Sequence, residues 1–196
     1  GGRCVARFAH EKGMAGTLMT FESRSGLHDA EILSDDAVLL KMTEPRAMIL
    51  HNHFPIAGVT RALHRINTGV PHAVCEVEEL ENFPVVETGR IICYLSAFVP
   101  EGTNADFIEV LDERTVALRT YERGVEDETL ACGTGAVAAA LISAALGKTH
   151  PPVAVHTRGG ETLTVGFYMS DLGFCDVTLS GGAEIIYEGT LEQSED

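Results

Sequence analysis

Apolar residues run almost without interruption through one short stretch of the chain. From Ala136 to Leu146 every residue except Ser143 is apolar, and most are Ala or Leu, the strongest helix formers. Gly147 and the pair Pro151-Pro152 follow, and these residue types cap and end helices. A helix that is apolar on every face is surrounded by protein. The pattern therefore predicts a buried helix that begins directly after Cys132.

Most of the remaining chain alternates apolar and polar residues, which is typical of strands with one buried face. A second helix is expected over Arg3–Lys12, because Gly13 follows as a stop signal. His51–Gly58 is polar and contains a proline, so we expect a loop there. The expected strands cover residues 17–22, 29–33, 35–42, 59–66, 72–77, 105–110, 115–121, 153–157, 161–165, 175–179 and 184–189.

Many strands and two helices, each opened by a glycine turn, predict the α+β class rather than a β-α-β alternation. A boundary is expected near Thr43-Glu44-Pro45, because Pro45 interrupts strand pairing. With 196 residues the chain can form one large domain or two small ones.

Composition excludes several classes of function. A formal net charge of −15 argues against nucleic acid, and no apolar run is long enough to span a membrane. Five cysteines without C-x-x-C spacing favour a reducing cytoplasm over disulfides or zinc. His51 and His53 lack a third ligand, so no metal site is expected. Since the chain does not begin with Met, Gly1 is expected to be an internal position.

Cys132 stands where chemistry is expected, at the N-terminus of the buried helix. The free N–H groups and the positive end of a helix favour a thiolate, and Gly133 and Gly135 leave these groups open to a carboxylate. The alternative is a structural cysteine beside a glycine turn, which is the commoner role of an isolated cysteine. The flanking C-G-T-G and the nearby Glu122-Arg123 pair favour the reactive interpretation.

Four ordered segments resemble the diaminopimelate epimerase family, whose members epimerise an amino acid without a cofactor. The resemblance covers the chain from Gly1 to about Gly189. It implies two similar domains, each a curved sheet around a central helix, with the active site between them. The matching segments are Gly1–Cys4, Asn67–His72, Gly102–Asn104 and Tyr121–Gly135.

The same resemblance assigns parts of the chain. Residues 1–45 are the remainder of an incomplete first domain, and a final strand, 184–196, returns to it. Residues 46–183 form the second domain, in which a short helix is expected over Val85–Arg90.

The implied reaction converts LL-diaminopimelate into meso-diaminopimelate, a step of lysine and peptidoglycan precursor synthesis. Cys132 is then one of two thiols that act as acid and base, tuned by Glu122, while His72 tunes the other. A small amino-acid substrate is the expected partner, a homodimer stays open, and no cofactor signature is visible. Val70 replaces an Asn that contacts substrate in many members, so that contact is lost or moved to the backbone. The implied substrate-binding residues are Asn104, Glu122, Arg123, Gly133 and Thr134.

The first cysteine motif of the family is C-G-N-G, which has the same layout as Cys132–Gly135. Gly1 corresponds to the last glycine of this motif, as Gly135 does in the second. The other three residues, Cys-Gly-Asn, would then lie directly before Gly1. Cys4 is then a packing residue and not the partner of Cys132. A chain with one of the two thiols is expected not to epimerise, since each thiol serves one face of the carbon.

Other interpretations remain at this point. Proline or hydroxyproline racemases share the two-thiol chemistry and the fold, and a related isomerase group uses the fold without the cysteine pair. A non-catalytic binding module can also be built on the same fold. Asn104 together with Glu122-Arg123 favours a substrate with a second amino-acid head. Exchange of the substrate α-proton in heavy water separates an enzyme from a binding module.

Overall fold

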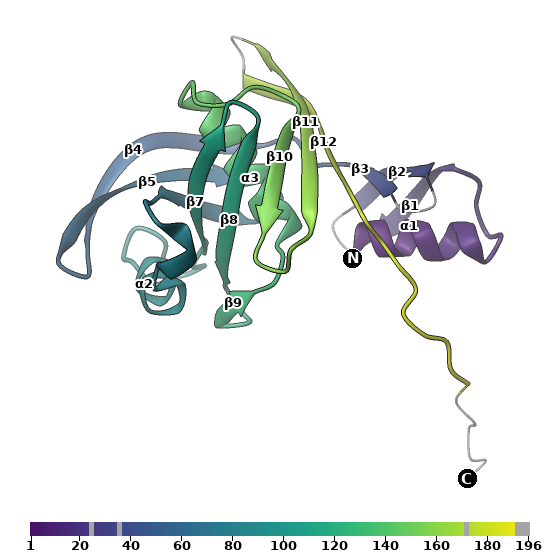
Figure 1. Cartoon of the computed structure of the whole chain (residues 1–196), viewed down its shortest axis with the longest axis horizontal. Coiled ribbons are helices and arrows are strands. Elements are labelled where there is room, and N and C mark those ends of the chain that lie inside the picture. Colours follow the sequence, from purple (N-terminus) through teal and green to yellow (C-terminus); the bar gives the residue numbers. More distant parts are fainter. Residues whose placement is uncertain (24–25, 35–36, 171–172, 191–196) are drawn as a thin grey trace.

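A computed structural model describes residues 1–23, 26–34, 37–170 and 173–190 of the chain (Figure 1). Within these residues the helices are α1 (Gly2–Glu11), α2 (Val85–Cys93) and α3 (Gly133–Ala145), with a short 3-10 turn at Leu80–Asn82. The strands are β1 (Leu18–Ser23), β2 (Gly26–Ser34), β3 (Ala37–Lys41), β4 (Arg46–Ile56), β5 (Val59–Asn67), β6 (Pro71–Glu76), β7 (Asn104–Asp112), β8 (Thr115–Glu122), β9 (Asp127–Thr129), β10 (Val153–Thr157), β11 (Thr162–Ser170) and β12 (Gly173–Gly181). Strands dominate and helices are few, as the α+β prediction required.

The strands form one continuous, curved sheet in the order β1-β2-β3-β12-β11-β10-β8-β7-β6-β5-β4, and β9 pairs with β8. Most neighbours are antiparallel. The exceptions in the described chain are β6–β7 and β8–β10, which are parallel. Parallel neighbours need a crossover, and α2 and α3 supply the two crossovers. The part of the sheet from β4 to β12 wraps around α3 (Figure 1).

The sheet can close around α3 because the helix is built from small apolar residues. All residues from Ala136 to Ser143 are fully buried, and strands β5 to β8 and β10 to β12 all contact the helix. Three consecutive alanines, Ala138–Ala140, let the surrounding strands come close without leaving cavities. Ser143 satisfies its hydroxyl internally, through the carbonyl of Ala140 and the Thr149 hydroxyl at 2.7 Å.

The N-terminal part packs separately. Helix α1 lies against β2 and β3, around a small core of Ala6, Ala30, Ile32, Val38 and Ala183. This part is joined to the rest by the chain itself at Met42–Pro45, which is neither helix nor strand, by the pairing of β3 with β12, and by the ion pair between Arg3 and Glu161 (Figure 1). The domain division expected at residues 45 and 46 stays a prediction.

One expected loop is a strand. His51–Gly58 was predicted to be irregular, but β4 runs to Ile56 and pairs with β5. The polar pattern misleads because β4 is an edge strand with alternate residues exposed, where Pro55 is tolerated. Left-handed backbone at Ala47 and His51 (φ 55° and 59°) accompanies irregular register in this hairpin.

One expected strand is not formed. Residues 184–189 alternate like a strand, yet the described chain there has no ladder, and Ile186 and Tyr187 are exposed. Strand β12 pairs with β3, and the segment after it follows α1 without forming a ladder: Arg7 donates to the Ala183 carbonyl and Lys12 pairs with Glu188. A strand needs a partner with open backbone groups, and alternation cannot supply one. Residues 191–196, the end of that expected strand, lie outside the described residues.

The other expected elements form within a few residues of their predicted bounds, and α2 extends three residues beyond Arg90. The acidic stretch of residues 35–36, expected to begin a strand, lies outside the described residues. No helix in the described chain is long and apolar enough to cross a membrane.

Gly89 is expected to be essential for the packing of α2 on β8. An added Cβ would lie 2.3 Å from Cβ of Tyr121, which is fully buried. Overpacking of this kind costs typically about 1–3 kcal/mol, so Gly89→Ala should lower the free energy of unfolding by at least that amount. Urea unfolding followed by circular dichroism measures it. Gly16→Ala is the matched control, because nothing lies within 4 Å of its added Cβ. Equal stability of the two variants would contradict this packing.

Candidate active site

The topology brings the expected site residues to one edge of the sheet. Strands β6 and β7 are parallel and start together, with His72 opposite Asn104. Strand β8 runs the other way and ends there, with Tyr121 opposite Ala105 and Glu122 next along the chain. Helix α3 begins beside this edge, since an added Cβ on Gly135 would lie 2.7 Å from the Asp106 carboxylate. Residues far apart in sequence therefore meet around the first turn of α3.

Cys132 is the N-cap residue of α3. Its backbone is extended (φ −125°, ψ 109°), and its carbonyl accepts the first helical hydrogen bond, from Ala136. The side chain is buried, with 7% of its surface exposed. Sγ lies 3.5 Å from the Thr134 hydroxyl. The cysteine thus faces the first turn of the helix, as its sequence position predicted.

The resting protonation of Cys132 depends on burial and nearby charges as well as on the helix end. Burial raises the pKa of the thiol to about 11, and the negative charges of Asp106 and Glu122 act in the same direction. The Thr134 hydroxyl and the Gly135 N–H lower the pKa, but by less. The helix end favours the thiolate, as predicted, but in the resting site this effect is too small to lower the pKa of the thiol below its ordinary value. Desolvation and two carboxylates outweigh the helix terminus.

Glycine is required in the first turn of α3 by close packing. A Cβ on Gly135 would come within 2.7 Å of Asp106 Oδ1 and 3.2 Å of the Thr120 hydroxyl. A Cβ on Gly133 would lie 3.1 Å from Leu179. The absence of side chains here lets the carboxylate of β7 approach the helix backbone directly.

Cys132, Glu122, Gly133 and Thr134 share a cavity of about 390 Å³. Its opposite wall comes from the N-terminal part of the chain, including Gly1, Gly2 and Leu40. The cavity therefore lies between the two parts of the molecule, with the start of α1 facing the start of α3.

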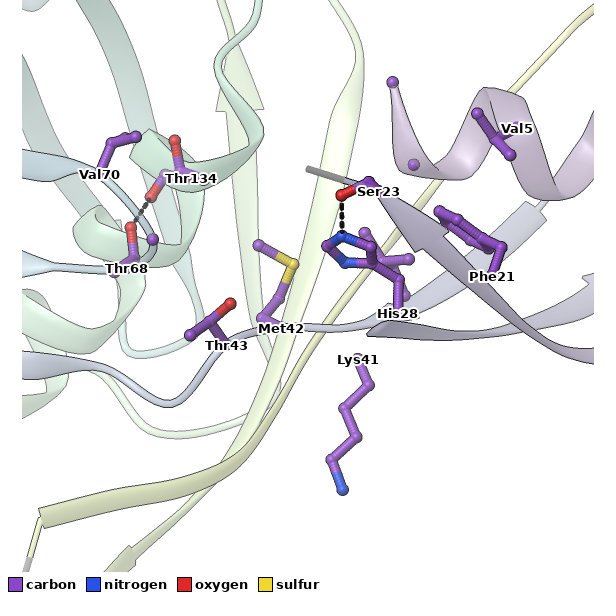
Figure 2. Close-up of a pocket in the computed structure, with 14 residues that line it drawn as sticks. Val5, Phe21, Ser23, His28, Lys41, Met42, Thr43, Thr68, Val70 and Thr134 are labelled. Atoms are coloured by element: carbon purple, nitrogen blue, oxygen red, sulfur yellow. Dashed lines mark hydrogen bonds between the residues drawn. The ribbon is translucent and has the colours of Figure 1, made fainter. Parts of the chain in front are cut away.

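A neighbouring cavity of about 450 Å³ shares Gly1, Gly2, Leu40, Met42 and Thr134 with the first (Figure 2). Figure 2 shows Val70, Thr68 and Thr134 on one side and Val5, Phe21 and His28 on the other. The Thr68 hydroxyl donates to the Thr134 carbonyl at 3.0 Å, which ties the turn before β6 to α3. Val70 thus adds an apolar side chain to the wall of this second cavity.

Asn104 and Arg123 are hydrogen-bonded to each other, and neither is among the residues lining these two cavities. The Asn104 Oδ1 accepts the Arg123 backbone N–H at 2.9 Å. The Arg123 guanidinium donates to the carbonyls of Glu101 and Gly102. This pair fixes the turn that follows β8 and so helps to position Glu122.

His72 is buried one strand away, and its partner is a residue that sequence reasoning missed. Nδ1 lies 2.6 Å from Asp106 Oδ2, and neither side chain has exposed surface. The Thr120 hydroxyl donates to the other oxygen, Oδ1, at 2.7 Å. A signal was available, since Asp106 is the single charged residue in the otherwise apolar run Ala105–Ile108. His72 itself lines a third cavity, of about 150 Å³, with Arg65 and Phe98.

Comparison with known proteins identifies the family. The diaminopimelate epimerase family model matches residues 65–165, which include all the site residues above except those of the N-terminal wall and Leu179. Diaminopimelate epimerase of Aquifex aeolicus is 40% identical over 194 residues, which is 98% of this chain and 68% of that protein. The Chlorobaculum tepidum enzyme is also 40% identical, over 97% of this chain and 73% of its own length.

Solved structures show the same fold at low identity. A hydroxyproline epimerase from Agrobacterium vitis, with bound trans-4-OH-L-proline, superposes with a TM-score of 0.72 at 19% identity, over 92% of this chain and 62% of that one. A PhzF-family phenazine biosynthesis protein from Bacillus anthracis gives 0.64 at 12% identity, over 93% and 71%. These structures support the architecture, whereas the sequence relatives specify the family. The chain belongs to the diaminopimelate epimerase family of isomerases.

Proposed function

We propose that this chain supplies one of the two proton-transfer groups that interconvert LL- and meso-diaminopimelate, and that Cys132 is this group. The observation that carries the proposal is the cavity in which Cys132, Glu122 and the start of α3 face the N-terminal part of the chain. Sγ removes the α-proton from one face of the substrate carbon or returns a proton to that face. A cysteine can do both, because its thiol and thiolate forms interconvert within the accessible pH range.

The first turn of α3 is proposed to hold the substrate α-carboxylate. The N–H groups of Gly133 and Thr134 have no helical partners at this position, and they carry the positive end of the helix. Negative charge that develops on the α-carbon and its carboxylate in the transition state is stabilised by these donors. The thiolate of Cys132 is stabilised by neighbouring donors of the same turn, the Thr134 hydroxyl and the Gly135 N–H.

The opposite face of the carbon needs a second thiol. The family resemblance puts it directly before Gly1, and Gly1 and Gly2 line the cavity opposite Cys132. In this proposal the start of α1 repeats the arrangement at the start of α3, and the substrate lies between two helix N-termini. The residues 1–45 and 46–183 then act as the two domains that close around it.

Asn104 and Arg123 are proposed to serve the distal end of the substrate. Arg123 has five guanidinium donors, and its contacts with the Glu101 and Gly102 carbonyls involve only Nη1. The remaining donors are suited to a second carboxylate. A proline-type substrate has no second head group, and the sequence relatives are diaminopimelate epimerases. We therefore favour diaminopimelate over proline, and lysine and peptidoglycan precursor synthesis in the cytoplasm as the setting.

Replacing Cys132 should abolish the reaction in the full-length protein. Cys132→Ala removes one of two groups that act as a unit, and such losses reach several orders of magnitude in rate. Formation of meso-diaminopimelate from the LL isomer in heavy water reports both turnover and α-proton exchange. Cys4→Ala and Cys175→Ala are the controls, because these cysteines lie outside the cavity and should retain most activity. Turnover by Cys132→Ala would refute the mechanism, and a binding module would exchange no proton in any variant.

The rate of alkylation of Cys132 should rise with pH up to higher values than for an exposed thiol, because burial raises its pKa. With the pKa raised to about 11, the thiolate is a minor form near neutrality. The rate of iodoacetamide alkylation should therefore rise about tenfold per pH unit from pH 7 to 10. Mass spectrometry of the Cys132 peptide gives the rate. The chain unfolded in urea is the control, in which the rise should level off near pH 9. Levelling below pH 9 in the folded chain would contradict the raised pKa.

A further inference from the structure

The buried carboxylate of Asp106 is used by nothing in the proposed mechanism, yet it contacts His72 and lies beside the first turn of α3 next to Cys132. It has no exposed side-chain surface, and it lies on β7 between His72 on β6 and Thr120 on β8. A buried carboxylate is costly unless its oxygens are paired. Here each oxygen has one partner: His72 Nδ1 at 2.6 Å and the Thr120 hydroxyl at 2.7 Å.

The pairing determines which nitrogen of His72 carries hydrogen. The Asp106 carboxylate has no hydrogen to donate, so it accepts from the Thr120 hydroxyl at one oxygen and from the imidazole at the other. Nδ1 of His72 is therefore the donor. Nε2 is buried and has no hydrogen-bond partner among the described residues. An unpaired N–H at this place would leave a buried donor unsatisfied, which is more costly than an unshared lone pair. Neutral His72 with hydrogen on Nδ1 and a free lone pair on Nε2 fits the contacts.

The same carboxylate also lies against the first turn of α3, close to Cys132. Oδ1 occupies the space next to Gly135, where a Cβ would be only 2.7 Å away. The groups that act on Cys132 are Asp106 from β7, Glu122 from β8, and the Thr134 hydroxyl and Gly135 N–H from α3. Arg3 of α1 also lines the cavity, but it is paired with Glu161 at 3.1 Å. Of the two carboxylates, Asp106 has the larger effect on the thiol, although Glu122 is the one that shares its cavity.

We propose that Asp106 is the positioning residue of this site, which fixes the Nδ1–H tautomer of His72 and holds Cys132 in its thiol form. One buried carboxylate thereby prepares an acceptor at His72 Nε2 and a donor at Cys132 Sγ. The inference rests on the proposed function and deepens it, because it assigns the resting protonation of Cys132, the proton-transfer group of that function, and of the neighbouring His72.

Two measurements test this assignment without requiring turnover. In the unmutated chain, long-range ¹H–¹⁵N spectra of His72 should show neutral imidazole with hydrogen on Nδ1. In Asp106→Asn the negative charge near Cys132 is removed, so its thiolate fraction should rise and iodoacetamide alkylation at pH 7.5 should be about 3–10-fold faster. Asp112→Asn is the matched control: it is on the same strand, exposed, and roughly 20 Å away at the strand rise, and it should leave the alkylation rate unchanged.

A second comparison separates the two carboxylates. Glu122→Gln should accelerate alkylation less than Asp106→Asn does, because Glu122 acts more weakly on the thiol. An Nε2–H tautomer or an imidazolium in the unmutated chain would overturn the proposal, as would an unchanged alkylation rate in Asp106→Asn. If Asp106→Asn does not fold, the spectrum of the unmutated chain decides alone. If the full-length protein does not epimerise diaminopimelate although the tautomer and the alkylation rates are as expected, the proposed function is refuted and this assignment stands.

Discussion

The burial of α3 is the constraint on which the rest of this structure depends. A helix of thirteen residues with no polar face has to be enclosed, and the enclosing sheet has to approach it closely on several sides. Alanines in the middle of the helix and glycines in its first turn make this approach possible. The enclosure removes Cys132 from solvent and brings strands β6, β7 and β8 to the helix N-terminus. The site is thus a consequence of how the core is packed.

Two opposing effects set the protonation of Cys132 at the start of α3: burial and nearby carboxylates favour the thiol, whereas the helix N–H groups favour the thiolate. The helix terminus and its N–H groups favour negative charge, but the thiol competes there with the Asp106 and Glu122 carboxylates. In the resting chain the carboxylates and desolvation prevail. A substrate that brings an ammonium group changes this balance, since a positive charge next to the sulfur favours the thiolate. The site is therefore poised so that the reactive form depends on what binds.

The two parts of the chain contribute differently to the cavities. The α3 side is held by a continuous core and by the tie between Thr68 and Thr134. The α1 side rests on a much smaller core and on the pairing of β3 with β12. Small apolar clusters stabilise weakly, so the α1 side is expected to be the less stable of the two parts.

The sequence by itself determined the elements that depend on local pattern. The apolar run from Ala136 predicted α3, and the glycines with Cys132 located its start. Alternation predicted most strands, because the order of apolar and polar residues shows directly which side chains share a face. The tertiary structure alone decided the features that depend on partners. Strand β4 forms because β5 is beside it, whereas residues 184–189 have the right alternation but form no strand pairing. The charge of Asp106 within an apolar run is visible in the sequence, but its partners are not, because His72 and Thr120 become its neighbours only when three strands align. The protonation of Cys132 depends on the tertiary structure for the same reason: a helix end is visible in a sequence, but the burial and the opposing charges around it exist only in the folded chain.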